Sequence, residues 1–312
     1  MPAQEQITID QHWAPRFYYK RFKDEKFELK VFDKLKWAIK KSKAYTQVSN
    51  EDFFFGMRTG VQDEISQRIE KAFDKVEGRF AKLYDKIIAN IYGTEPMQDE
   101  YLHELAFFMS MLWVRSNLFR KITLDASVEF EKQFLAKVTQ NSSFMNQISA
   151  EVEDNRGIQI SQSERAEFID VMVNKKYTIN PTNEAHLQCF VDIELYASYF
   201  YEKKWRFYTS STGQNFFTSD VPVVEIPSED NSFWGNPIWK RTHYFPLTPK
   251  ILIELTDPNG FGKKVKRKSL KTDAEIREYN LKIIGYSHEE IYTSDIEQFD
   301  YIKAKYRPHT PK

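Results

Sequence analysis

Three polar residues lie in apolar surroundings, where their side chains are suited to chemistry. His12 precedes an aromatic segment, and an imidazole with a pKa near neutrality can act as a general acid or base. Asp220 lies in the segment 218–220 between two apolar stretches, where a carboxylate can bind a metal, orient a histidine or accept a proton. Arg115 interrupts an apolar helix, and a buried guanidinium is rare unless it pairs with an acid or an anion.

Each of these residues also has a structural explanation, and the sequence leaves both explanations open. His12 can fix the N-terminal segment by bonding a backbone carbonyl group. Ser219 and Asp220 can hold a turn through nearby backbone amides, with Pro222 fixing the exit. Arg115 can form an internal salt bridge in place of a phosphate or carboxylate clamp.

Substrate binding is the candidate role of four residues, namely Arg16, Arg115, Ser219 and Asn280. Arg16 could add positive charge near His12, although a solvent-exposed strand position is the favoured explanation for it. Asn280 can bond a ligand, a loop or a helix cap. The basic run 263–268 is expected to be a solvated loop, because such charge runs usually face water.

Composition and motifs exclude several classes of protein. The chain has 312 residues, a formal net charge of zero and one cysteine, so it can form no internal disulfide and no Cys-rich zinc site. A net charge of zero gives the chain no general attraction to nucleic acid or anionic membranes. No Gly-rich phosphate loop, His-Glu-x-x-His or Gly-x-Ser-x-Gly motif is present. No signal peptide or membrane-spanning run is visible, so we expect a cytoplasmic protein without a membrane partner.

Hydrophobic periodicity predicts strands at both ends of the chain and helices between them. Residues 13–22 and the alternating segment 26–33 indicate a small β element, with Phe53–Phe55 as a further edge strand. The predicted helices are 61–91, 98–119, 125–138, 161–173, 183–205 and 273–284. Short strands are predicted after residue 205, at 215–218, 221–224, 250–255 and 291–293.

This order predicts an α+β fold, with one mixed sheet built from N- and C-terminal strands beside a large central helical block. We expect an N-terminal β segment at 1–56, a helical block at 57–205 and a C-terminal β-rich part at 206–312. The three parts are expected to form one compact domain.

Three segments in this order resemble signatures of the bacterial family known as domain of unknown function 4238. They are residues 12–19 (His-Trp-Ala-Pro-Arg-Phe-Tyr-Tyr), 216–223 (Phe-Phe-Thr-Ser-Asp-Val-Pro-Val) and 245–249 (Phe-Pro-Leu-Thr-Pro). Trp13, Arg16 and Thr248 depart from the residues usual in that family, while His12 and Asp220 are retained. The resemblance spans nearly the whole chain and implies a shared fold and candidate positions, but no reaction.

Two functional hypotheses follow from the candidate residues. In the first, the chain is a nuclease-like or other phosphate-substrate hydrolase acting as a bacterial defence or toxin effector, with nucleic acid or a nucleotide as partner. His12 is then the acid or base, Asp220 orients it or binds a divalent metal, and Arg115 neutralises phosphate charge. In the second, the chain is a non-enzymatic binding protein whose signature motifs are structural.

Overall fold

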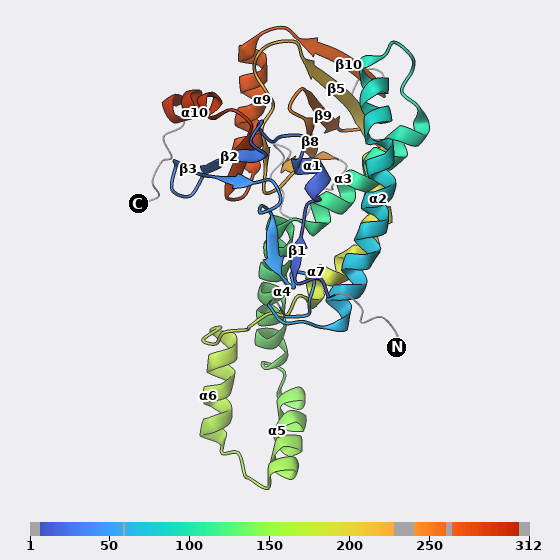
Figure 1. The fold of residues 1–312 in the computed structure, drawn as a ribbon. Helices are drawn as coiled ribbons and strands as arrows, with labels where there is room; N and C mark the ends of the chain where they lie inside the picture. The colour runs from blue at the N-terminus through green and yellow to red at the C-terminus, as the bar shows by residue number, and fades with distance from the viewer. Residues whose placement is uncertain (1–6, 59, 228–239, 260–263, 306–312) are drawn as a thin grey trace, which may run out of the picture. The chain divides into compact units, whose positions relative to one another are not determined.

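The computed structural model describes residues 7–58, 60–227, 240–259 and 264–305. The chain forms two compact units, the first made of 1–120 with 187–312 and the second of 121–186. Helices and strands are both abundant, which confirms the predicted α+β class (Figure 1). Within the described ranges, no helix is both long and apolar enough to cross a membrane.

The N-terminal segment contains a short helix where a strand was predicted. Strand β1 (Asp10–His12) pairs antiparallel with β4 (Asn50–Asp52), and helix α1 (Arg16–Tyr19) follows it. Pro15 precedes the helix with φ −64°, a backbone angle that suits helix entry. The buried aromatic residues Tyr18, Tyr19 and Phe22 recur at three- and four-residue spacing, so the prediction of a strand here was wrong.

The predicted edge strand at Phe53–Phe55 is a turn, which directly follows β4. Phe53 adopts the left-handed backbone region with φ 50°, and its carbonyl oxygen accepts a hydrogen bond from Gly56 N. A residue in that region ends a strand. Phe54 and Phe55 are fully buried, so the aromatic run serves the core and adds no strand.

A four-stranded antiparallel sheet joins both ends of the chain, as the sequence predicted. Its order is β3 (Ala38–Ala44), β2 (Glu28–Asp33), β11 (Glu290–Thr293) and β6 (Thr218–Ser219). Tyr292 on β11 lies opposite Val31 on one side and Thr218 on the other. The sheet therefore fixes the C-terminal signature segments beside the N-terminal strands.

The remaining C-terminal strands form a separate five-stranded mixed sheet, so the strands build three sheets and not one. Its order is β10 (Val265–Leu270), β5 (Lys204–Ser210), β9 (Ile251–Thr256), β8 (Thr242–Thr248) and β7 (Val224–Ile226). Strand β10 runs parallel to β5 and contains residues 265–268 of the basic run. The prediction of a solvated loop at 263–268 was therefore wrong, because residues 265–268 pair with β5 and form a strand. Lys263 lies outside the described residues.

The five-stranded sheet is covered by side-chain clusters on both faces, because successive strand residues point to opposite sides. Phe207, Phe245 and Ile253 pack in the main core with helices α2 (Glu64–Tyr92), α3 (Asp99–Arg115) and α8 (Ile193–Glu202). Tyr208, Tyr244 and Leu252 pack on the other face, where Ile276 and Ile283 come from α9 (Asp273–Tyr286). The alternation places α9 on one side of the sheet and the longer helices on the other.

Helices α2 and α3 follow the predicted ranges closely. The Asp63 side chain accepts a hydrogen bond from Ser66 N at the start of α2, and Gly93 stands at its end. Helix α3 ends before Ser116, whose extended backbone separates it from α4 (Asn117–Val138). Ser116 Oγ donates to Trp113 O and accepts from Phe119 N, so the predicted helix 98–119 is divided by one capping serine.

Shorter elements complete the first unit. They are α7 (Glu184–Gln188), which begins in the second unit, the 3₁₀ turns η1 (Cys189–Asp192) and η3 (Ile296–Phe299), and α10 (Asp300–Lys305). The predicted helix 183–205 is thus three helical pieces ending at Glu202, where β5 takes over two residues later.

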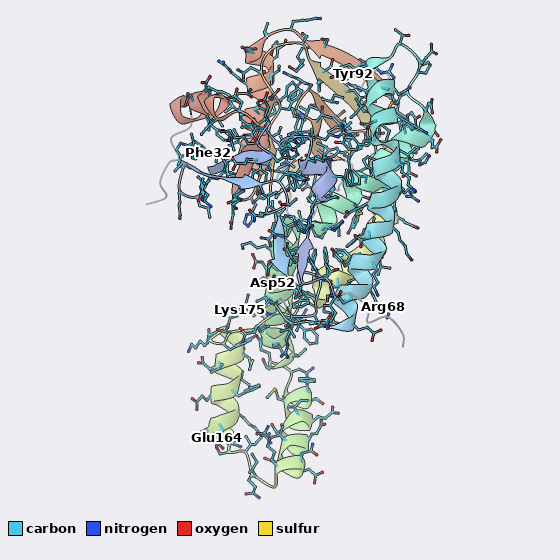
Figure 2. The ribbon with its side chains drawn as sticks, viewed as in Figure 1. Phe32, Asp52, Arg68, Tyr92, Glu164 and Lys175 are labelled. Atoms are coloured by element: carbon cyan, nitrogen blue, oxygen red, sulfur yellow. The ribbon has the colours of Figure 1, made fainter. Side chains whose placement is uncertain are left out.

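The second unit is helical. It contains most of α4, then α5 (Ser142–Arg156) and α6 (Gln162–Val173). Helix α6 begins with a capping box made by Ser161 and Glu164, with both reciprocal hydrogen bonds formed. Glu164 is labelled in Figure 2 at the start of α6. Helix α5 was not predicted, because its sequence is polar and its apolar residues form no clear stripe.

We expect Phe108→Ala to lower the free energy of unfolding by about 3–5 kcal/mol, the usual range for emptying a buried aromatic site. The Phe108 ring is fully buried on α3 and stacks on Phe80 with 3.8 Å between ring centroids. Urea denaturation would measure the change. Phe130→Ala on α4 is the matched control, because that side chain is 70% exposed and its loss should change stability by less than about 1 kcal/mol.

Candidate active site

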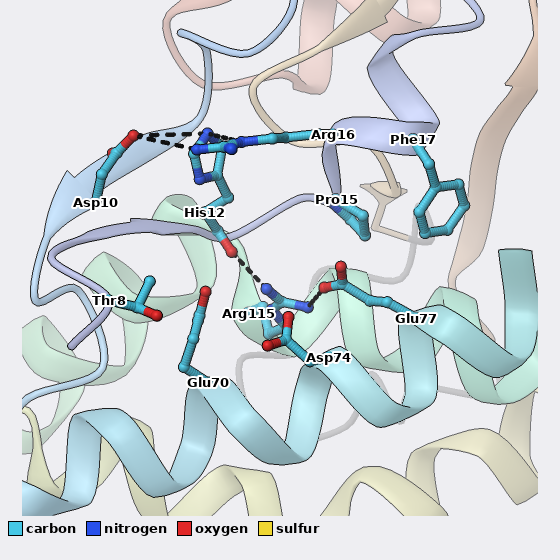
Figure 3. Close-up of a pocket in the computed structure, with 10 residues that line it drawn as sticks. All are labelled: Thr8, Asp10, His12, Pro15, Arg16, Phe17, Glu70, Asp74, Glu77 and Arg115. Carbon is cyan, nitrogen blue, oxygen red and sulfur yellow. Dashed lines mark hydrogen bonds and ion pairs between the residues drawn. The ribbon is translucent and has the colours of Figure 1, made fainter. Parts of the chain in front are cut away.

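A pocket of about 360 Å³ lies in the first unit between the N-terminal segment and helix α2 (Figure 3). It brings together three sequence-predicted residues, His12, Arg16 and Arg115. The described residues that line it are Thr8, Asp10, His12, Pro15, Arg16, Phe17, Glu70, Asp74, Glu77 and Arg115. Six of these side chains are charged at neutral pH or close to it, so the pocket is strongly polar.

Helix α2 contributes three acidic side chains to the pocket. Glu70, Asp74 and Glu77 are separated by four and three residues, which places them on one helix face. Figure 3 shows all three projecting from α2 toward the N-terminal segment. The sequence interpretation missed them because acids on an amphipathic helix usually face water. Their signal was the position of this acidic row directly beside the buried residues Phe73 and Phe80.

Hydrogen bonds fix the N-terminal segment against α2. Thr8 N donates to Gln67 Oε1 at 2.9 Å, and Gln67 Nε2 donates back to Thr8 O at 2.8 Å. Gln11 is fully buried and its Oε1 accepts from Phe55 N at 2.9 Å. These contacts hold the residues on both sides of Asp10 and so position His12 over the acidic face of α2.

Arg115 lies at the base of the pocket and is 1% exposed. Its Nη1 is 2.6 Å from Glu77 Oε1, and its Nη2 donates to the backbone carbonyl of His12. The guanidinium also lies over the Phe73 ring, 4.1 Å from the centroid. The internal salt bridge, one of the two explanations considered for this residue, is therefore present. Its Nε is buried and has no hydrogen-bond partner among the described residues.

Glu70 is the most unusual carboxylate of the pocket. Its Oε2 is buried and has no hydrogen-bond partner in the described part of the chain. Burial, together with the negative charges of Asp74 and Glu77, raises the pKa of Glu70 to about 7 against the opposing positive charge of Arg115. The side chain therefore exchanges a proton close to neutral pH, which is the property required of a general acid or base.

His12 is buried at the upper edge of the pocket. Its Nε2 lies 3.1 Å from Thr46 O and 3.4 Å from Arg16 Nε, so the tautomer decides which of the two bonds forms. Burial lowers the pKa of His12 below its ordinary value of 6.5, so the ring is neutral at neutral pH. Arg16 is 3.5 Å from Asp10 Oδ2, and its side chain is 54% exposed at the rim.

Asp220, Ser219 and Asn280 do not line this pocket. The Asp220 carboxylate is buried and accepts hydrogen bonds from the backbone amides of Glu289 at 2.7 Å, Glu290 at 3.2 Å and His288 at 3.3 Å. Burial raises the pKa of Asp220 to about 7, and these amides oppose the shift. The side chain thus connects the loop after β6 to the start of β11.

Ser219 and Asn280 likewise bond backbone groups. Ser219 Oγ donates to Val221 O at 2.7 Å and accepts from Val221 N at 3.1 Å, which is the turn that the sequence suggested. Asn280 Oδ1 accepts from Phe217 N at 2.9 Å, and its Nδ2 donates to Asn215 O at 2.8 Å. Both side chains hold the segment 215–221 in place.

The three signature segments contact one another through aromatic side chains. Tyr18 Oη is 2.7 Å from Thr218 Oγ1 and donates to Pro246 O at 2.8 Å. Tyr19 Oη donates to Ser219 O at 3.0 Å, and Trp13 Nε1 donates to Asp220 O at 2.8 Å. Residues 200 or more positions apart in sequence are therefore held together in the core.

The described residues offer no set of side chains that would bind a metal ion. Across the described ranges, no group of three or more His, Cys, Asp or Glu side chains is arranged to hold a metal ion. The divalent metal that the sequence allowed therefore has no assigned position.

The family model described as a protein of unknown function (DUF4238) matches residues 10–297. No curated protein and no solved structure matches the chain.

We expect Glu70→Gln to become more stable than the wild type as pH rises. The folded pKa of Glu70 is about 7 and its ordinary value is 4.5, so the carboxyl contributes stability at low pH that is lost as pH rises through about 7. Because the side chain is half-buried, we expect the free energy of unfolding of the variant, relative to that of the wild type, to increase by about 1–2 kcal/mol between pH 4.5 and 8. Urea denaturation at pH 4.5 and 8 measures this difference. The control is Glu131→Gln on the exposed face of α4, for which we expect no such increase.

We expect Asp220→Asn to lower the free energy of unfolding by about 2–4 kcal/mol at pH 8, because an amide cannot accept all three backbone hydrogen bonds. Urea denaturation is again the measurement, and Asp154→Asn at an exposed position of α5 is the control. Unchanged stability of Asp220→Asn would contradict the structural role assigned to this carboxylate.

Proposed function

Because the chain belongs to the DUF4238 family, whose description names no activity, we propose its function from the pocket: a hydrolase that acts on a small substrate by general acid–base catalysis. The observation that carries the proposal is the half-buried Glu70 carboxyl, which lines the pocket, has one buried oxygen without a hydrogen-bond partner among the described residues, and has a pKa of about 7. Strongly shifted carboxyl groups in a pocket are typical of catalytic acids and bases.

Glu70 has the required proton-transfer role in this proposal. Its carboxylate takes a proton from a water molecule as the water oxygen attacks the substrate, and it returns that proton to the leaving group when the scissile bond breaks. Arg115 and Arg16 supply positive charge beside the pocket, where negative charge on the reacting centre would develop. His12, neutral at neutral pH, is available as a hydrogen-bonding group or second base.

The size and charge of the pocket favour a small substrate over a polymer. A volume of about 360 Å³ lies in the range of small-molecule sites, roughly 300–1,000 Å³. Among the described residues, four carboxyl groups and two guanidinium groups line the pocket. A polyanion would meet repulsion from the acidic face of α2.

The phosphate-substrate hydrolase remains a second proposal, and the exposed Arg16 at the pocket rim favours it. In this version Arg16 binds the phosphate group and His12 is the acid or base, because they lie 3.4 Å apart. A nuclease-like activity in bacterial defence or toxicity would be its biological setting. Asp220 has no catalytic part in this version, since its oxygens are engaged with backbone amides.

A binding protein without catalysis is the third reading, favoured by the backbone hydrogen bonds of Asp220, Ser219 and Asn280. Residues of the resembled signatures then maintain the fold, and the pocket only binds its ligand.

One experiment separates the three proposals. The purified chain would be incubated with RNA, single- and double-stranded DNA, and a panel of p-nitrophenyl esters, glycosides and phosphates, each with and without Mg²⁺. The variants are Glu70→Gln, Arg16→Ala and His12→Ala, with Glu131→Gln as the control. We expect turnover of a small substrate that Glu70→Gln lowers by about 10²–10⁴-fold.

Other outcomes assign the other functions. Nucleic-acid cleavage that Arg16→Ala and His12→Ala abolish, while Glu70→Gln leaves it unchanged, would support the phosphate-substrate proposal. If no substrate is turned over, or if all variants match the wild type, the catalytic proposals fail and the binding protein remains.

A further inference from the structure

The charges of the pocket divide into satisfied pairs and an unsatisfied remainder. Arg115 is paired with Glu77 at 2.6 Å, and Arg16 is paired with Asp10 at 3.5 Å. After these pairs are removed, Glu70 and Asp74 are the acidic residues of the lining without an ion pair to any described residue. The protein itself therefore leaves net negative charge in the pocket.

Glu70 and Asp74 are one helical turn apart, and like charges at this spacing repel each other. Both face the same volume (Figure 3). A cation placed between them would remove the repulsion and give Glu70 Oε2 the donor that it lacks. An anion would add to the repulsion.

At the base of the pocket, a ligand would have to supply a hydrogen-bond acceptor and not a cation. Arg115 is 1% exposed and its buried Nε–H has no acceptor among the described residues. A buried donor without an acceptor is unfavourable. An oxygen atom on the ligand, close to its cationic group, would supply that acceptor.

We infer that the pocket binds a small hydroxylated primary amine, with the ammonium group against Glu70 and Asp74 and a hydroxyl oxygen toward Arg115. The inference rests on the proposed function, since it names the substrate class of the same pocket. It combines the cavity, the two carboxylates without ion pairs and the two buried polar atoms without partners. Phe17 and Pro15 supply the apolar wall beside which the carbon skeleton would lie.

Three probes of similar size and different charge test the inference by isothermal titration calorimetry at pH 8. They are 3-amino-1,2-propanediol, which is a cation with two hydroxyl groups, glycerol, which is neutral, and glycerate, which is an anion. We expect the amine to bind at least about tenfold more tightly than either of the others, because only the amine forms charge-assisted hydrogen bonds with the acids.

Variants then locate the binding. Glu70→Gln and Asp74→Asn should each weaken amine binding by about tenfold, while Asp85→Asn, an exposed carboxylate on the same helix outside the pocket, should leave it unchanged. Asp74 is exposed, so its variant is expected to fold normally. Circular dichroism would verify the fold of all three variants.

Two results overturn the inference: glycerate binding as tightly as the amine, or no heat from the amine at 100 mM with folded wild-type protein. The turnover assay keeps the inference separable from the proposed function. Turnover that depends on Glu70, without amine binding, would contradict the inferred ligand class and leave the proposed function standing. Amine binding that depends on Glu70 and Asp74, without turnover of any substrate, would contradict the proposed catalytic function and leave the inferred ligand class standing.

Discussion

The arrangement of the pocket depends on one buried charge, the guanidinium of Arg115. A buried charge is strongly unfavourable unless it is paired and hydrogen-bonded, and the partners of Arg115 come from two separate parts of the chain. Glu77 comes from α2, the carbonyl oxygen of His12 from the end of β1, and the ring of Phe73 again from α2. Satisfying this one side chain on α3 therefore fixes α2 and the N-terminal segment, and the pocket is the space left between them.

A second constraint comes from aromatic side chains with polar ends. Tyr18, Tyr19 and Trp13 bury their rings and donate hydrogen bonds to backbone carbonyl groups of the segments around β6 and β8. Loops that enter a core carry carbonyl groups that water cannot reach, and these donors satisfy them. The signature segments that suggested the family therefore have a structural reason to occur together, which is independent of any reaction.

The sequence predicted the features that local pattern determines. The stripe of apolar residues along α2 predicted a long helix correctly. Strand β10 was missed because its outward residues are charged and its existence depends on pairing with β5. The pocket was found only in part: His12, Arg16 and Arg115 were predicted individually, whereas Glu70 and Asp74 belong to the site only because the N-terminal segment folds over α2. That is a tertiary event which leaves no local pattern.

The comparison of Asp220 with Glu70 shows why a shifted pKa alone does not identify a functional carboxyl group. Burial raises both pKa values to about 7. Asp220 is surrounded by three backbone amides that occupy its oxygens, so nothing remains to bond a substrate. Glu70 has a buried oxygen without a donor, carboxylate neighbours that disfavour its charge, and an adjacent cavity. Its unused lone pairs therefore have no protein partner beside that cavity, which makes Glu70, and not the aspartate of the signature segment, the better candidate for chemistry.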